Sequence, residues 1–175
     1  VHSETSEPDA IDEENEIIIA GVGRFGQVVY RMLTNSGFNA TVLDHNMRTI
    51  ELLRKFGIKT FFGDPTRPDL LHSAGIEKAK TLIVAVDGKE AAVEIVRYAR
   101  RIRPDLHIVA RAYDRVHVYQ LFQAGANDIV REMFDASLRA GRYALESMGV
   151  SEFDASEAEK EFYSMDRSAV KELAE

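Results

Sequence analysis

The sequence predicts an α/β protein with a Rossmann-like, doubly wound, parallel six-stranded sheet. Six short runs are rich in Ile, Val and Leu, segments with helical spacing alternate with them, and a glycine-rich turn follows the first run. Strands that are apolar at nearly every residue are typical of a parallel sheet covered by helices on both faces. Strict alternation with short connections predicts right-handed crossovers and the strand order 3-2-1-4-5-6.

The elements can be placed along the chain from this periodicity. The expected strands are 16–20, 40–43, 59–62, 81–85, 107–111 and 128–131. The expected helices lie near 25–36, 47–56, 67–74, 88–103 and 114–124. We divide the chain into an acidic, flexible linker (1–14), a Rossmann-type domain (15–137) and a C-terminal, peripheral helical extension (138–175). The apolar residues of 154–175 are too sparse to form a core, so this part should pack across the edge of the sheet or onto a partner.

Composition excludes several classes of protein. Apolar residues make up 45% and charged residues 29% of the 175, as in ordinary globular proteins. No apolar run approaches the roughly 18 residues of a membrane span, and the N-terminus lacks the basic and apolar regions of a signal peptide. The chain has no cysteine, which excludes disulfides, thiolate metal sites and cysteine nucleophiles. A cytoplasmic setting is the natural interpretation.

The net charge of −7 is distributed unevenly. Residues 1–16 carry seven acids and no Lys or Arg, and 151–175 carry eight acids and three bases. The middle, 17–150, therefore carries 14 acids and 19 bases, a net charge of +5. This mildly basic middle suits a small anionic ligand, although ordinary solvated charge explains it as well. The bases are too few and too interspersed for a nucleic-acid surface.

The turn "GVGRFG" at 21–26 follows an expected strand and opens an expected helix. In a dinucleotide-binding turn of this pattern, Gly21 permits the tight turn, Gly23 lets the backbone approach a diphosphate, and Gly26 lets helix and strand pack closely. The helix N-terminus then presents free N–H groups and a partial positive charge to phosphate. This context predicts a nucleotide site.

Asp44 ends the second expected strand, 18 residues after Gly26. Its carboxylate could accept hydrogen bonds from both hydroxyls of an adenosine ribose and would repel a 2′-phosphate. His45 and Asn46 supply no guanidinium for such a phosphate, so NAD(H), AMP or a related adenine nucleotide is favoured over NADP. The alternative, that Asp44 caps the helix at 47–56, is weaker because Asn46 is better placed to cap.

Other residues follow later strands and face the carboxyl edge, where open α/β sheets bind ligands. Asp64 could bind the adenine amino group or cap the next helix, and Arg111 could bind the ligand or form an ion pair with Asp87 or Asp114. The predicted nucleotide-binding residues are Gly21, Val22, Gly23, Arg24, Phe25, Gly26, Asp44, His45, Asp64, Pro65, Ala85, Val86 and Arg111.

No catalytic set accompanies this site. A dehydrogenase needs a substrate domain and a proton donor or acceptor beside the nicotinamide. None of the six tyrosines is followed four residues later by a lysine, and the five histidines show no metal-binding or nucleophile-activating spacing. The sequence therefore predicts a binding protein without enzymatic activity. The alternatives are an NAD-dependent oxidoreductase domain lacking its substrate domain and a scaffold in which the nucleotide only stabilises a dimer.

Four segments resemble the RCK/KTN (TrkA-N-like) domain of Kef-type, glutathione-gated potassium efflux systems. They are "AGVGRFGQ", "VLDHN", "LRKFGIKTFFGDPTRPDLLHSAG" and "IVARAYDRVHVYQLFQAGANDIVRE", and "ALESMG" extends the likeness to 150. The resemblance implies a regulatory domain at the cytoplasmic face of the bacterial inner membrane, following a cation:proton antiporter-like membrane domain of the same polypeptide. It also implies a homodimer, with an ancillary cytosolic activating subunit as a further partner.

The resemblance further implies two ligands. AMP or NADH binds in the fold, and glutathione or its adducts bind in a cleft between subunits, where glutathione holds the channel closed and bulky adducts open it. The positions that match the family's glutathione-contacting pattern are Arg31, Phe56 and Arg131. Arginine forks bind carboxylates bidentately, which fits this ligand. Without the family, Arg31 is a surface residue, Phe56 a core residue, and Arg131 an ion-pair partner of Glu132 or a neighbour.

The last helix departs from the family's pattern. Relatives tend to carry an amide in this segment, where the present chain has Tyr163-Ser-Met-Asp166. An acid close to anionic glutathione would weaken its binding by like-charge repulsion.

Overall fold

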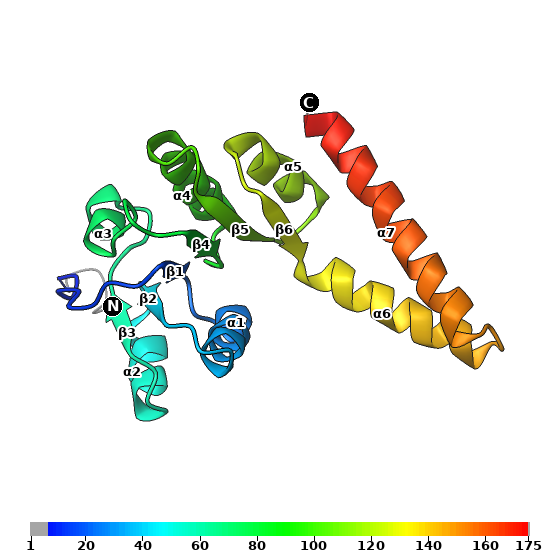
Figure 1. The fold of residues 1–175 in the computed structure, drawn as a ribbon, viewed down its shortest axis with the longest axis horizontal. Helices are drawn as coiled ribbons and strands as arrows, with labels where there is room; N and C mark the ends of the chain where they lie inside the picture. Colours follow the sequence, from blue (N-terminus) through cyan, green and yellow to red (C-terminus); the bar gives the residue numbers. More distant parts are fainter. Residues whose placement is uncertain (1–6, 175) are drawn as a thin grey trace.

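A computed structural model describes residues 7–174 and places six strands in one parallel sheet (Figure 1). The strand order β3-β2-β1-β4-β5-β6 confirms the prediction. The strands are β1 Ile17–Ala20, β2 Ala40–Asp44, β3 Thr60–Phe62, β4 Thr81–Val84, β5 His107–Ala112 and β6 Asp128–Arg131. The helices are α1 Arg24–Asn35, α2 Met47–Lys55, α3 Pro68–Ser73, α4 Lys89–Ile102, α5 Arg115–Ala124, α6 Glu132–Ser147 and α7 Glu152–Ala174. Every strand, and each of the first five helices, begins and ends within one residue of its predicted position.

Local side-chain chemistry sets several of these boundaries. The Asn46 side chain accepts a hydrogen bond from the Arg48 backbone N–H (3.0 Å) and caps α2, as expected. The Asp114 carboxylate accepts from the His117 backbone N–H (2.8 Å) and caps α5. Gly125 ends α5 at φ 113°, in the left-handed region that glycine adopts without steric cost. These caps explain why sequence alone located the helices closely.

Hydrophobic cores lie on both faces of the sheet. Helices α3, α4 and α5 cover one face, and α1 and α2 cover the other (Figure 1). Successive residues of a strand point to opposite faces, so Ile18 belongs to the larger core with α3, α4 and α5, and Ile19 to the smaller one. Burial on both faces is the reason that the strands are almost continuously apolar.

The register of the sheet brings the carboxyl ends of the strands to one edge. Ala20 of β1 lies beside Leu43 of β2 and Val84 of β4, and Val84 lies beside Ala110 of β5. The loops that follow β1, β2, β3 and β4 therefore meet at this edge.

The described part of the N-terminal segment, 7–16, lies against the fold. The Asp9 backbone N–H donates to the Phe62 carbonyl (2.8 Å), and the Asp9 carboxylate accepts from the Phe62 N–H and from Arg54 Nη2 (both 2.8 Å). Ile11 packs against the larger core. Polar composition predicted a flexible linker here and did not indicate these contacts; the first six residues lie outside the described part of the chain.

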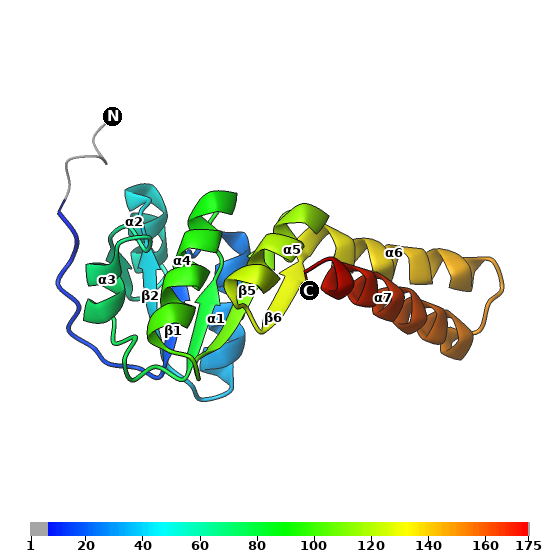
Figure 2. The same cartoon turned by 90° about the horizontal axis from the view of Figure 1, so that it is seen from above.

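The C-terminal extension forms a helical hairpin that projects from the end of the sheet (Figure 2). None of the residues of α6 is buried, and α7 turns back to pack against α6 and α5, close to the edge strand β6. Of the two placements expected for 154–175, the structure shows packing at the edge of the sheet, and packing onto a partner stays a prediction. Within residues 7–174 no helix is long and apolar enough to cross a membrane.

His117 is a buried polar residue that ties α5 to the start of α4. The Tyr113 backbone N–H donates to Nδ1 (3.1 Å), so Nε2 carries the proton and donates to the Lys89 carbonyl (3.0 Å). Burial lowers the pKa of His117, against the smaller opposing effects of the Lys89 carbonyl and the Asp114 charge. The neutral imidazole is therefore the form that the fold favours.

We predict that Gly26→Ala lowers the thermal stability of the chain. A Cβ at this position would lie 2.4 Å from the carbonyl oxygen of Gly21. That oxygen belongs to the backbone, so it cannot rotate away as a side chain could. Overpacking of this kind costs about 1–3 kcal/mol, which thermal unfolding followed by circular dichroism would detect. Gly23→Ala is the matched control, since its Cβ would meet nothing within 4 Å. Equal destabilisation by the two substitutions would contradict the close packing described here.

We also predict that the free energy of unfolding decreases as the pH falls from about 7.5 to about 5. The pKa of His117 is below its ordinary value of 6.5 in the folded chain, so the unfolded chain binds more protons in this range. Stability therefore rises with pH through this window. Urea unfolding at several pH values measures the slope. His117→Gln keeps a donor for the Lys89 carbonyl but does not titrate, so its slope should be shallower; an unchanged slope would exclude His117 as the cause.

Candidate functional site

The loop between β1 and α1 lies at the carboxyl edge and packs tightly on the end of β4. Gly21 has φ 97°, and a Cβ there would come within 2.6 Å of backbone atoms of Ala85 and Val86. Gly23 precedes α1, faces open space and supplies no side chain to cap the helix. The first N–H groups of α1 therefore have no side-chain cap, and such a helix start attracts anions.

Asp44 lies beside this loop at the end of β2 and is only 7% exposed. Its Oδ2 accepts a hydrogen bond from the Val22 N–H (2.8 Å), and its Oδ1 accepts from the Asn46 N–H (2.7 Å). The carboxylate thus holds the glycine loop and the β2–α2 turn in place, a structural role that the sequence did not predict. Each oxygen has a second acceptor direction, which leaves capacity for ribose hydroxyls. The alternative that Asp44 caps α2 is wrong, because Asn46 does so.

Two adjoining hollows open between these elements. The larger, about 590 Å³, lies between the ends of β3 and β4, and the smaller, about 50 Å³, lies between the glycine loop and β2. They share His45, Val86 and Asp87, and we call them together the edge cleft. Nine of the thirteen predicted nucleotide-binding residues line it: Gly21, Val22, Gly23, Asp44, His45, Asp64, Pro65, Ala85 and Val86.

The edge cleft also contains side chains that the predicted set omitted. Thr66 and Arg67 follow β3, and Asp87 follows β4. Their signal in the sequence was positional, since each comes within five residues of the carboxyl end of a strand. Arg67 is a cation in the wall of the larger hollow, beside the predicted residues Asp64 and Pro65.

Asp64 stabilises the turn that follows β3. Its Oδ1 accepts hydrogen bonds from the Thr66 backbone N–H (3.0 Å) and the Thr66 hydroxyl (2.7 Å). Arg67, not Asp64, directly precedes α3, so the alternative that Asp64 caps this helix is wrong. The carboxylate remains in the wall of the edge cleft.

Arg111, at the end of β5, is buried behind the glycine loop rather than in the cleft wall. Its guanidinium carbon lies 5.6 Å from the centroid of the Phe25 ring, and Nη2 donates to Asp87 Oδ1 (3.1 Å). Its Nη1 lies 3.6 Å from Glu132 Oε2 at the start of α6. Of the two ion pairs considered for Arg111, the one with Asp87 forms, and Asp114 instead caps α5. Arg111 therefore links the loop, β4 and the C-terminal extension.

The three residues matched to a second ligand are not brought together within one chain. Arg31 is exposed on α1, and Phe56 follows α2 with 74% of its surface exposed. The interpretation of Phe56 as a core residue is therefore wrong. Neither Arg31 nor Phe56 lines the edge cleft or the pocket that contains Arg131.

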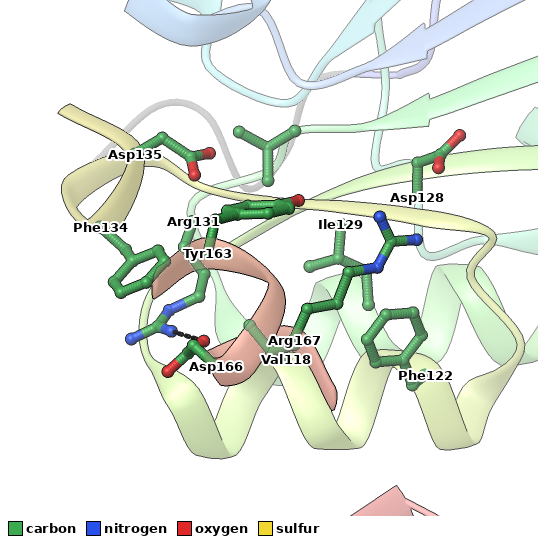
Figure 3. Close-up of a pocket in the computed structure, with 11 residues that line it drawn as sticks. Val118, Phe122, Asp128, Ile129, Arg131, Phe134, Asp135, Tyr163, Asp166 and Arg167 are labelled. Atoms are coloured by element: carbon green, nitrogen blue, oxygen red, sulfur yellow. Dashed lines mark hydrogen bonds and ion pairs between the residues drawn. The ribbon is translucent and has the colours of Figure 1, made fainter. Parts of the chain in front are cut away.

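Arg131 lines a pocket of about 240 Å³ between β6, α5, α6 and α7, which we call the α7 pocket (Figure 3). Its Nη1 donates to Asp166 Oδ2 (2.8 Å), and its guanidinium carbon lies 4.0 Å from the centroid of the Phe134 ring. Arg131 is thus an ion-pair partner, as one interpretation of the sequence held, but the acid is Asp166 on α7 and not Glu132. Burial raises the pKa of Asp135 in the same pocket, although the Arg131 charge opposes the shift.

Comparison with known proteins agrees with this architecture. The family model of the TrkA-N domain matches residues 17–132, and that of the potassium efflux system KefB C-terminal domain matches 136–175. The glutathione-regulated potassium-efflux system protein KefC of Cronobacter sakazakii is 46% identical over 170 residues, and KefC of Escherichia coli O139:H28 is 45% identical over 172 residues. These matches cover 97% and 98% of the chain, which spans only 27% and 28% of the two relatives.

Solved structures give the same result. The AMP-bound Kef C-terminal domain of Shewanella denitrificans superposes with a TM-score of 0.81 at 42% identity, covering 91% of this chain and 98% of that one. The TrkA-N domain of the inner membrane protein ybaL from Escherichia coli has a TM-score of 0.67 at 29% identity. The superposition covers 78% of this chain and 98% of that one. The predicted fold class is confirmed, and so is the prediction that the chain is not an enzyme, since its relatives belong to potassium efflux systems. The chain belongs to the TrkA-N domain family and continues into a Kef-type C-terminal domain.

Proposed function

We propose that the chain is the ligand-sensing regulatory domain of a bacterial potassium efflux system and that the edge cleft binds an adenine nucleotide, AMP or NAD(H). The observation that carries the proposal is the place of Asp44, a buried carboxylate directly beside the uncapped start of α1. The helix start thus favours a phosphate, and the carboxylate beside it favours hydroxyl donors. The AMP-bound form of the Shewanella denitrificans domain, at 42% identity, supports this assignment.

The proposed pose follows from the chemistry of the cleft. The phosphate lies at the N-terminus of α1, the ribose hydroxyls donate to Asp44, and the adenine enters the larger hollow beside Asp64 and Pro65. A 2′-phosphate would meet the Asp44 charge, and the adjacent His45 and Asn46 carry no guanidinium to offset it. The cleft therefore selects AMP or NAD(H) over NADP.

We further propose that the domain acts as a homodimer. Helix α6 buries no residue; Met133 at its start is 76% exposed, and Met148, directly after its end, is 82% exposed. Val28 and Met32 on α1 are also largely exposed. Large apolar side chains that are exposed in a single chain are candidates for an interface with a partner. The hairpin that projects from the sheet in Figure 2 would gain its missing partner from a second copy.

Glutathione or its adducts are the proposed second ligand, bound between subunits by Arg31, Phe56 and Arg131. Within one chain Arg31 and Phe56 do not line the pocket that contains Arg131, so in this proposal a second copy brings the three residues to a shared ligand. The exposed ring of Phe56 is free to be displaced by a bulky adduct.

Since the chain spans about 28% of its KefC relatives, we assign the cation:proton antiporter-like membrane domain to the rest of the polypeptide and place this domain at the cytoplasmic face of the inner membrane. An ancillary cytosolic activating subunit is a further proposed partner.

The nucleotide site is tested by Asp44→Asn. The ribose hydroxyls lose a charged acceptor, while the amide oxygen still accepts one of the two backbone hydrogen bonds that hold the loop. Loss of a hydrogen bond to a charged group costs about 1.5–3 kcal/mol, so AMP should bind at least about tenfold more weakly in isothermal titration calorimetry. Asp154→Asn, an exposed acid at the start of α7, serves as the control and should bind AMP normally. Unchanged AMP affinity in Asp44→Asn would refute the placement of the ribose.

The glutathione site is tested by Arg31→Gln. The side chain is exposed, so its replacement should leave the fold intact, and a lost carboxylate partner should weaken glutathione binding about tenfold. Arg97→Gln, an exposed arginine on the opposite face of the sheet, is the matched control. AMP affinity should be unchanged in both variants. Equal glutathione affinity in Arg31→Gln and Arg97→Gln would remove Arg31 from the site.

A further inference from the structure

The α7 pocket holds an ion pair between residues far apart in the sequence. Arg131 ends β6 and Asp166 lies on α7, and Figure 3 shows their charged groups facing each other. Both side chains are mostly buried, with 20% and 18% of their surfaces exposed. One face of the guanidinium lies over the Phe134 ring, and among the side chains that the structure describes only Asp166 accepts a hydrogen bond from it. Arg131 is therefore already neutralised from within the chain.

The charge balance of the pocket reinforces this point. Its lining includes three acids, Asp128, Asp135 and Asp166, and two bases, Arg131 and Arg167. Asp128 faces away toward His107, with Nε2 and Oδ2 2.6 Å apart. The pocket has an arginine fork and aromatic walls suited to a carboxylate ligand with an apolar part, yet its net charge does not attract an anion.

We propose that Asp166 is a specificity-determining residue that occupies Arg131 and must be displaced by the carboxylate of any anionic ligand that enters the α7 pocket. This inference rests on the proposed function, in which Arg131 contributes to a glutathione site. It concerns how selective that site is. Weakly binding anions fail to displace an internal carboxylate, so only a ligand that gains further contacts, as at Arg31 and Phe56, occupies the pocket.

The energetics of displacement give the direction of the effect. A ligand carboxylate on the Arg131 fork would lie within a few ångströms of the Asp166 carboxylate, and two like charges in a mostly buried site repel strongly. Moving Asp166 aside instead leaves a mostly buried charge without its partner, which also costs free energy. An amide at position 166 removes both costs, because its oxygen can still accept from Arg131 while its NH2 group donates to the ligand.

Asp166→Asn should therefore bind glutathione at least about tenfold more tightly than the unmodified chain, measured by isothermal titration calorimetry. Glu161→Gln, an exposed acid on α7, makes the same change in net charge away from the pocket and should leave the affinity unchanged. Asp166→Glu retains the charge and should behave like the unmodified chain. AMP titrations of all four proteins should give one common affinity, which shows that the sheet and the edge cleft are intact.

Several results would overturn the proposal. Unchanged or absent glutathione binding in Asp166→Asn, with AMP binding intact, would show that the internal carboxylate does not compete. Weaker binding would show that Asp166 contacts the ammonium group of glutathione instead. A failure of the proposed function would look different, because AMP would bind none of the four proteins or glutathione binding would be insensitive to Arg31→Gln.

Discussion

The close approach of the glycine loop to the end of β4 is the constraint on which the site depends. Only a residue without a Cβ fits here, because a Cβ on Gly21 would lie 2.6 Å from backbone atoms of Ala85 and Val86. That approach sets the start of α1 at the carboxyl edge and carries the Val22 N–H to the Asp44 carboxylate. A loop lifted from the sheet would lose this hydrogen bond and the alignment of α1 with the cleft. Packing and ligand binding therefore share the same few atoms.

Most of the fold was predictable because its signals are local. Apolar runs mark strands buried on both faces, and glycine and capping side chains mark where helices begin and end, as at Asn46 and Gly125. The contacts of Asp9 with β3 and of Asp166 with β6 were not predictable, since each joins segments that are far apart in the sequence. Periodicity places a residue on a face of its own element. It does not identify the residue of another element that the side chain contacts.

The candidate site shows the same division. Its location follows from topology, because parallel strands bring their carboxyl ends to one edge, and nine predicted residues gather there. The role of each residue was harder to predict from the sequence. Arg111 is buried behind the loop and linked to α6, and Asp64 stabilises a turn rather than a helix start. The grouping of Arg31, Phe56 and Arg131 stays a prediction, since a single chain holds them apart.

The central claim is that an adenine nucleotide binds across the carboxyl edge of this sheet. Amide chemical-shift mapping by nuclear magnetic resonance during a titration with AMP tests it most directly. The account predicts that the largest shifts cluster in 21–26, 44–46, 63–67 and 85–88, which line the edge cleft or form its glycine loop. Amides of the α6–α7 hairpin should change little by comparison. Shifts confined to the hairpin, or no shifts at saturating AMP, would contradict the account.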